Sequence, residues 1–216
     1  MLGMVACHAP HRTFEWTGDD SGWVAGFADY PKGVEVEWNF VSGRRPLPAP
    51  LSSPHLALYI AGDNRSDDLF MFWKRRVTGL TPRRSYAASL DVSFASNAPR
   101  GCAGAGGAPG ESVYVKLGAA TNEPVTSVDA DGNVRISIDK GNQATSGREA
   151  VTVGDIATTN TNCAAPVWEE KRLHTTQPIR VTADPSGAIW VVMGTDSGFE
   201  GRTQIYYISL RLQLDP

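Results

Sequence analysis

Residues 206–214 read "YYISLRLQL", and this stretch decides the fold class. Apolar or aromatic side chains recur at every second position, while Ser209, Arg211 and Gln213 lie between the later ones. Successive side chains of a β-strand point to opposite faces, so this period of two predicts a strand with one core face and one solvent face. The residues expected on the core face are Tyr206, Ile208, Leu210, Leu212 and Leu214.

Most of the remaining chain has the same strand character. Alternation also marks residues 34–40, 86–94, 113–117 and 134–138, and apolar runs occupy 56–61, 69–73, 179–183 and 188–193. Turn motifs such as "DADGNV" and "ADPSGA" separate these segments, and only "VWEEKRLH" at 167–174 suggests helical turns. Many strands with regular turns predict an all-β protein: an antiparallel β-sandwich, jelly-roll-like, with little helix.

The length and the net charge of the chain further restrict the class of protein to which it can belong. A chain of 216 residues can form one sizeable core, so we expect a flexible N-terminus over 1–13 and a single β-sandwich domain over 14–216. The formal net charge of -3 argues against nucleic-acid binding, which needs clustered Lys and Arg. No segment approaches the roughly 18 apolar residues of a membrane-spanning helix, so no transmembrane span is expected.

The chain contains three cysteines, Cys7, Cys102 and Cys163. Cys102 and Cys163 both lie in polar, loop-like segments, which favours a disulfide between them and an extracytoplasmic location. Cys7 ends the segment "MLGMVAC", in which small residues precede the cysteine as they do at a bacterial lipoprotein cleavage site. Cys7 is therefore either the site of a lipid anchor or an incidental cysteine in a disordered N-terminus.

The segment "GLTPRRSY" introduces a family resemblance. Leu80, Pro82 and Tyr86 fit the tyrosine corner of β-sandwich domains, in which a Tyr hydroxyl binds backbone a few residues upstream. Jelly-roll carbohydrate-binding modules use a similar step, and they often begin with an aromatic strand that leads to a Gly-Trp pair, as in "FEWTGDDSGW".

Longer phrases, including "GWVAGFADYP", "GGAPGESVYVKLGA" and "DKGNQ", resemble an uncharacterised family of bacterial secreted proteins and lipoproteins. The resemblance covers most of the chain after about Phe14. It implies a β-sandwich outside the cytoplasm and no established activity. Jelly-roll modules often hold a structural calcium with an Asp in the last strand, whereas residues 206–208 are Tyr-Tyr-Ile in this chain, which puts a calcium site there in doubt.

The segment "GDNRSDDLFMFW", residues 62–73, combines acidic residues with a strand. If residues 56–61 and 69–73 are strands, residues 62–68 form the connecting loop, where Asp, Asn and Ser favour turns. The alternative is an oxygen-rich site for Ca²⁺ or another ligand. Its candidate ligand-binding residues are Asp63, Arg65, Asp67 and Asp68. The five apolar residues that follow predict a central strand covered on both faces.

A second acidic segment, "GTDSGFEG" at 194–201, places Asp196 and Glu200 among glycines. Its Asp-Ser-Gly lacks the Thr or Ser and the second copy that an aspartic protease needs, so a ligand-binding or cation-binding loop is the preferred interpretation. "DADGN" predicts a hairpin turn before a calcium loop. "GAGGAPGES" carries Glu111 where a phosphate-binding loop needs Lys, which argues against nucleotide binding.

The six tryptophans complete the set of candidates. Trp38, Trp73 and Trp190 lie within expected strands and are predicted in the core, whereas Trp23 and Trp168 are candidate exposed platforms for sugar rings. Together these features predict a noncatalytic, extracytoplasmic module for carbohydrate or another cell-envelope ligand.

Two other classes of function remain open. "SVYVKLGA" resembles the Tyr-x-Lys-x-Gly strand of certain jelly-roll alginate lyases, which makes Tyr114 and Lys116 candidates in a polysaccharide lyase or hydrolase. The third class is a structural protein of the cell surface.

Overall fold

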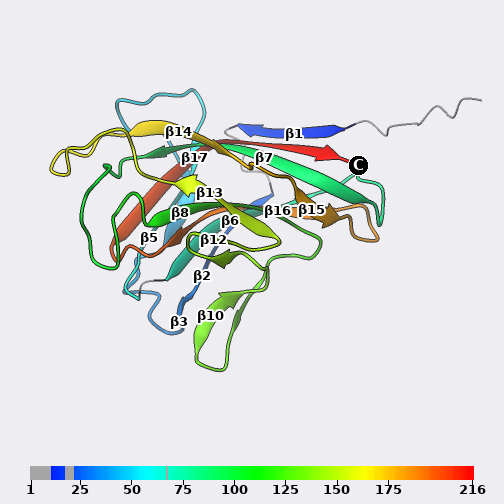
Figure 1. The fold of residues 1–216 in the computed structure, drawn as a ribbon, viewed down its shortest axis with the longest axis horizontal. Coiled ribbons are helices and arrows are strands. Elements are labelled where there is room, and N and C mark those ends of the chain that lie inside the picture. Colours follow the sequence, from blue (N-terminus) through cyan, green and yellow to red (C-terminus); the bar gives the residue numbers. More distant parts are fainter. Residues whose placement is uncertain (1–10, 18–21, 67) are drawn as a thin grey trace, which may run out of the picture.

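Two large antiparallel sheets lie face to face in the computed structural model, which describes residues 11–17, 22–66 and 68–216 (Figure 1). The seven-stranded sheet contains β1 (Arg12–Thr17), β4 (Val41–Arg45), β5 (Ala57–Asp63), β7 (Ser85–Ser96), β14 (Glu169–His174), β15 (Ile179–Thr182) and β17 (Arg202–Asp215). The five-stranded sheet contains β2 (Trp23–Ala28), β6 (Leu69–Val77), β8 (Val113–Ala120), β13 (Ala150–Asp155) and β16 (Ile189–Ser197). The predicted antiparallel, jelly-roll-like β-sandwich is confirmed.

The long strands alternate between the two sheets, because β5, β7 and β17 belong to one sheet and β6, β8 and β16 to the other. Each strand turns its apolar face toward the opposite sheet, so the main core lies between them. Leu90 of β7, Leu117 of β8 and Val191 of β16 are all fully buried there. The alternation read from 86–94 and 113–117 is therefore a correct guide to the core.

Strand β6 is covered on both faces, as its five consecutive apolar residues predicted. Met71 faces the core between the sheets, whereas Phe70 and Phe72 face the opposite side and pack with Ile138 and Val192. Both neighbours of β6, β16 and β2, are hydrogen-bonded to it along its length. The second cover comes from the segment 121–149, which crosses the outer face of the five-stranded sheet.

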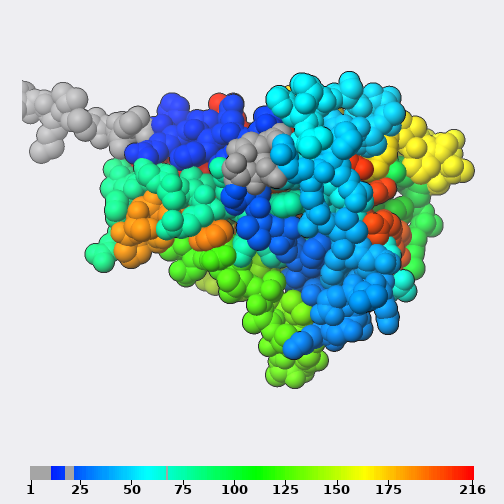
Figure 2. Space-filling model, turned by 180° about the vertical axis from the view of Figure 1, so that it is seen from behind, coloured from blue at the N-terminus to red at the C-terminus, as the bar shows by residue number. Residues whose placement is uncertain are grey.

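Segment 121–149 forms two small sheets with a neighbouring strand. One contains β3 (Tyr30–Pro31), β9 (Thr126–Val128) and β10 (Asn133–Ile136), and the other contains β11 (Gly141–Asn142) and β12 (Thr145–Ser146). Figures 1 and 2 show the β3–β10–β9 sheet projecting from one side of the sandwich. The predicted hairpin in "DADGN" is confirmed, since β9 pairs with β10 and the backbone N–H groups of Asp131 and Asn133 donate to Asp129 Oδ1.

A β-bulge in β17 changes which face of the sheet some of its side chains occupy, so the expected core face of this strand is partly wrong. The register of β17 against β7 shifts between Tyr207 and Ser209, which reverses the orientation of the side chains before it. Leu210 and the later leucines face the core as predicted, but Tyr206 and Ile208 do not. Tyr206 instead packs on the outer face, where its ring lies 4.7 Å from that of Tyr59.

Two other expectations from the sequence are wrong. Residues 34–40 form turns rather than a strand, since no strand of the described ranges pairs with them and Asn39 adopts a left-handed φ of 46°. Residues 167–174 give no helical turns, since β14 pairs with β7 instead. Its period of two is hidden in the sequence because Lys171 takes an inward position, where Nζ binds the carbonyl oxygens of Asp155 and Ala157.

A tyrosine corner and a disulfide hold loops of the sandwich in place. The backbone N–H of Thr81 donates to the Tyr86 hydroxyl at 3.1 Å, so the tyrosine corner is present. Cys102 and Cys163 form a disulfide with a Cα–Cα distance of 5.8 Å, which joins the loop after β7 to the loop after β13. Cys7 lies outside the described residues. No helix in the described ranges is long and apolar enough to cross a membrane.

Candidate ligand-binding site

The residues predicted to bind a ligand lie in three separate places. Asp63, Arg65 and Glu200 line one open hollow, whereas Asp68 and Asp196 belong to a buried network of charged groups. Trp23 lies elsewhere, and Asp67 is outside the described residues. We treat the open hollow as the candidate ligand site because it combines Asp63, Arg65 and Glu200 with access from solvent.

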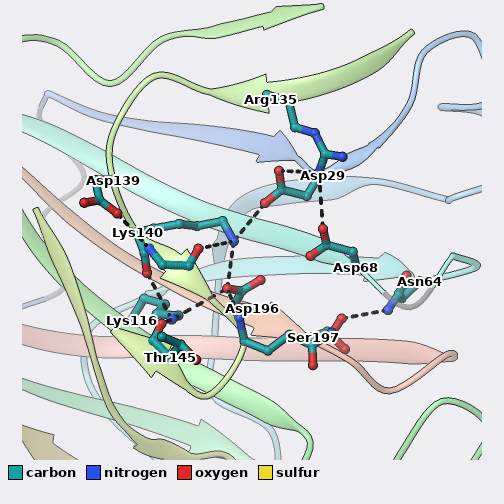
Figure 3. A network of polar contacts seen from close by, with 12 residues as sticks. Asp29, Asn64, Asp68, Lys116, Arg135, Asp139, Lys140, Thr145, Asp196 and Ser197 are labelled. Carbon is teal, nitrogen blue, oxygen red and sulfur yellow. Dashed lines mark hydrogen bonds and ion pairs between the residues drawn. The ribbon is translucent and has the colours of Figure 1, made fainter. Parts of the chain in front are cut away.

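The polar hollow, as we call it, has a volume of about 570 Å³ and lies where β5 ends and β17 begins. The loops after β5 and β16 meet there because Asn64, which is buried, donates from Nδ2 to the carbonyl oxygens of Ser197 and Phe199, each at 2.9 Å. Figure 3 shows the contact between Asn64 and Ser197. The polar hollow is lined by Asp63, Asn64, Arg65, Ala105, Glu200, Gly201 and Arg202.

Asp63 is held as an oriented carboxylate in this hollow. Arg202 Nη1 donates to Asp63 Oδ1 at 2.9 Å, and Asn39 Nδ2 donates to Oδ2 at 2.8 Å. Burial alone would raise the pKa of Asp63, but these two hydrogen bonds outweigh it and hold the pKa below its ordinary value. Arg65 is also oriented, because its Nε donates to the carbonyl oxygen of Glu37 at 3.0 Å.

A second, more apolar hollow of about 340 Å³ adjoins the first, and Arg202 lines both. The ring of Phe199 forms part of its wall. Gly104 and Gly201 flank this ring so closely that a Cβ at either position would come within 2.5 Å of it. The other residues that line this hollow, which we call the apolar hollow, are Asn97, Ala98, Pro99, Cys102, Ala103, Pro109, Ile156, Cys163, Pro166, Thr203 and Gln204.

Sequence reasoning missed Asn64 and Arg202. Asn64 was read as a generic turn residue, and Arg202 follows the "GTDSGFEG" segment without any motif of its own. Only the pairing of β5 with β17, which sets Arg202 opposite Asp63, identifies it. The sequence signal for Arg202 is its position directly after an acidic, Gly-rich segment.

Trp23 is not the exposed platform that the sequence suggested. Its side chain is buried between the sheets and meets the ring of Trp16 edge-on at 5.5 Å. Trp38 and Trp73 are buried as predicted, but Trp190 is half-buried under the Lys74 ammonium. Trp168 is also half-buried, and its ring packs edge-on against Tyr206.

The buried network lies on the outer face of the five-stranded sheet, beneath segment 121–149 (Figure 3). Lys140 Nζ lies 2.7 Å from Asp196 Oδ2 and 2.9 Å from Asp29 Oδ2. Arg135 Nη1 lies 3.1 Å from Asp29 Oδ1 and 3.2 Å from Asp68 Oδ2. Burial would lower the pKa of Lys140, but Asp196 and Asp29 hold it above its ordinary value. Burial, reinforced by Asp29 and Asp196, raises the pKa of Asp68 to about 6.

Lys116 anchors segment 121–149 to the sheet from below. Its fully buried Nζ donates to the carbonyl oxygens of Lys140 and Thr145, at 3.1 and 2.7 Å, and to Thr152 Oγ1 at 2.8 Å. Burial lowers the pKa of Lys116 to about 8, against the opposing effect of Asp196. All three ammonium protons are used and the side chain has no exposed surface, so a polysaccharide cannot reach it.

Among the described residues, the network also contains a group of three carboxylates placed to hold a metal ion. Asp29, Asp68 and Asp196 each offer one oxygen, and these oxygens lie within 4.8 Å of one another. Asp63 and Asp68, two candidates for the Ca²⁺ site considered in the loop at 62–68, lie in different groups of residues.

No family model matches this chain, and neither does any curated protein sequence. Similar solved structures include carbohydrate-binding modules from the β-sandwich superfamily, at 12% identity and a TM-score of 0.42 over 88% of this chain. The chain spans 56% of that structure.

Two further similar structures are those of the modules TmCBM61, with bound β-1,4-galactotriose, and TmCBM27, which recognises mannan. The first has 11% identity and a TM-score of 0.40, and the match covers 90% of each chain. The second has 11% identity and a TM-score of 0.42 over 96% of this chain and 100% of that one. At this level of similarity the comparisons carry no argument about function, which has to come from the site.

Proposed function

We propose that this protein is a noncatalytic, extracytoplasmic module that binds carbohydrate, or another hydroxyl-rich ligand of the cell envelope, in the two adjoining hollows. The observation that carries the proposal is the juxtaposition of the polar hollow with the apolar hollow, with Arg202 lining both. A sugar presents hydroxyl groups at its edge and C–H groups on its faces, so it needs both kinds of surface side by side.

The charged groups of the polar hollow suit hydroxyl recognition. Glu200 has an exposed side chain and supplies a carboxylate acceptor. Arg202 donates from Nη1 to Asp63 and also interacts with Tyr59, and because it lines the hollow its planar guanidinium can offer further N–H donors to a hydroxyl of the ligand. Because Asp63 and Arg65 are oriented by contacts within the protein, little ordering is required when a ligand binds.

Asp63 is not suited to act as the general acid of a glycosidase. A glycosidase of the common type needs one carboxyl group with a raised pKa to act as general acid. The pKa of Asp63 is lowered instead, so this group stays ionised and acts as an acceptor. The lyase alternative is weakened as well, because Lys116 is fully buried beneath segment 121–149.

The location outside the cytoplasm is supported by the Cys102–Cys163 disulfide, since such bonds persist in oxidising compartments. The disulfide also lines the apolar hollow, so oxidation is expected to shape the binding site. Loss of the bond on reduction should therefore weaken ligand binding as well as stability.

The test is a polysaccharide panel read by pull-down, with titration calorimetry on any ligand captured and with measurement of released reducing or unsaturated ends. Glu200→Ala should weaken binding at least about tenfold, because a hydrogen bond to a charged group is worth roughly 1.5–3 kcal/mol. Glu15→Ala is the matched control, since Glu15 is an exposed carboxylate on β1, outside both hollows.

The outcome of the polysaccharide panel distinguishes carbohydrate binding from an enzymatic and from a structural function. Binding that Glu200→Ala weakens and Glu15→Ala leaves unchanged would support the proposal. Binding that both variants retain would place the ligand elsewhere. Release of new sugar ends would identify an enzyme, and neither binding nor release would favour a structural protein of the cell surface.

A further inference from the structure

Two carboxylate oxygens in the buried network lack a partner within the described part of the chain. Asp196 is fully buried, and its Oδ2 receives Lys140 Nζ at 2.7 Å and the backbone N–H of Gln143 at 2.8 Å. Its Oδ1 is equally buried and has no hydrogen-bond partner. The same is true of Asp68 Oδ1, although Asp68 Oδ2 pairs with Arg135. Leaving two such oxygens unsatisfied is costly.

The two oxygens face each other. Figure 3 shows the second oxygen of Asp196 turned toward that of Asp68, on the side away from Lys140 and Lys116. One oxygen from each of Asp29, Asp68 and Asp196 lies within 4.8 Å of the other two. Oxygens bound to one Ca²⁺ ion, each at about 2.4 Å from it, lie no more than about 4.8 Å apart, so this upper bound is compatible with a shared cation.

The network carries an excess of negative charge, which a bound cation would offset. Four carboxylates contact three cationic side chains among the described residues, which leaves one excess negative charge. Lys140 and Arg135 bind oxygens other than the two unpartnered ones. The carboxylates of the network are Asp29, Asp68, Asp129 and Asp196, and the cations are Lys116, Arg135 and Lys140.

A third hollow, of about 350 Å³, opens beside the network and is lined by Asp29, Asp68, Arg135, Ile136, Ile138, Lys140, Gly141 and Asn142. Solvent therefore reaches the edge of the network, although the two unpartnered oxygens are themselves buried. The donors are all oxygens, which suits hard cations and disfavours zinc, whose usual ligands are His and Cys. Ca²⁺ accepts an irregular set of carboxylates completed by water, whereas Mg²⁺ demands a near-ideal octahedron.

We propose that Asp68 and Asp196, with Asp29, bind a Ca²⁺ ion at the junction between segment 121–149 and the five-stranded sheet. This proposal does not depend on carbohydrate binding. It differs from the site expected in the loop at 62–68, because only Asp68 belongs to that loop and the other two residues come from β16 and from the position after β2. All three ligands lie in or directly beside strands of the five-stranded sheet, so the ion joins the ends of β2, β6 and β16.

The experiment measures the melting temperature of the whole chain in EDTA and in CaCl₂, at constant ionic strength and neutral pH, with MgCl₂ in parallel. Asp68→Asn keeps the shape of the side chain but removes its charge. Asp63→Asn, at the opposite end of the same loop, is the matched control. We expect Ca²⁺ to raise the melting temperature of the wild type and of Asp63→Asn, and to have no effect on Asp68→Asn. Mg²⁺ should have a smaller effect.

Several results would overturn the proposal. One is an unchanged wild-type melting temperature up to about 10 mM Ca²⁺, ten times the weakest dissociation constant of typical extracellular calcium modules. Another is an equal response in all three proteins, which would place the ion elsewhere. If Asp68→Asn is more stable than the wild type without Ca²⁺ and the wild type ignores the ion, a proton or water fills the gap. Should Asp68→Asn fail to fold, equilibrium dialysis of the wild type decides, with one ion per chain expected and none refuting the site.

Discussion

Arg202 and Asp63 face each other across the last residue pair that β5 and β17 share, with Nη1 2.9 Å from Oδ1. This pair joins the end of one strand to the start of another and lies in the wall of the polar hollow. Arg202 is also in the wall of the apolar hollow. One guanidinium group therefore contributes to the walls of both hollows.

Replacing this guanidinium with an ammonium should separate binding from stability. Arg202→Lys retains the charge but loses the planar fork, so we expect glycan affinity to fall about tenfold. The free energy of unfolding should change by less than about 1 kcal/mol, because the Arg202 side chain is 40% exposed and such ion pairs contribute little. Calorimetric titration and urea denaturation measure the two quantities. An unchanged affinity would remove Arg202 from the ligand site.

Lys116 is expected to matter for stability rather than chemistry. Lys116→Met removes the hydrogen bonds to Lys140 O, Thr145 O and Thr152 Oγ1, and it leaves Asp196 with less buried positive charge. Breaking such a buried charge network should lower the free energy of unfolding by roughly 3–5 kcal/mol, as measured by urea denaturation.

The control for this substitution is Lys32→Met, which changes an exposed lysine and should stay within about 0.5 kcal/mol of the wild type. Equal small effects of the two substitutions would show that Lys116 does not anchor segment 121–149.

The disulfide should stabilise the protein by restricting the unfolded chain. Cys102 and Cys163 are 61 residues apart, so the double variant with Ser at both positions should lose about 2–4 kcal/mol of unfolding free energy. Denaturation with and without reductant measures this loss, and mass spectrometry without reductant identifies the bond. A reductant that leaves wild-type stability unchanged would contradict the expectation.

Two tyrosines are expected to respond oppositely to loss of the hydroxyl. The Tyr207 hydroxyl is fully buried and has no hydrogen-bond partner in the described ranges, so Tyr207→Phe should raise the free energy of unfolding by about 1 kcal/mol. The Tyr86 hydroxyl accepts from the Thr81 N–H, so Tyr86→Phe should lower the free energy by a similar amount. Urea denaturation of both variants tests the contrast, and the same sign for both would refute it.

The lowered pKa of Asp184 predicts that the stability of the protein depends on pH. Hydrogen bonds from the hydroxyl of Ser186, and from the backbone of Ser186 and Ala188, lower the pKa of Asp184 to about 2. A carboxyl with a depressed folded-state pKa stabilises the protein above its unfolded pKa and loses this contribution as the pH falls through the folded value.

The measurement is thermal denaturation of the wild type and of Asp184→Asn across this range. The stability difference should be constant above about pH 5 and should shrink as the pH approaches about 2. A difference that is the same at both ends of the range would show that the Asp184 charge contributes nothing.

Much of this architecture could be predicted because it depends on local patterns. Leu90 and Leu117 lie in alternating segments whose faces the sequence defines, and the tyrosine corner needs only a few consecutive residues. The pattern failed where a single residue interrupts it. One extra residue in β17 turned Tyr206 to the outer face, and an inward lysine at position 171 concealed β14.

By itself, the sequence determined the all-β fold class, the positions of most strands and the acidic segments that supply the sites, because side-chain alternation and turn chemistry act over a few residues. Only the tertiary structure decided which acidic residues lie together. Asp63 and Asp68 share a loop, yet one lies against Arg202 and the other against Arg135. Strand pairing and register, which bring residues far apart in the chain into contact, cause this division, and no local pattern records them.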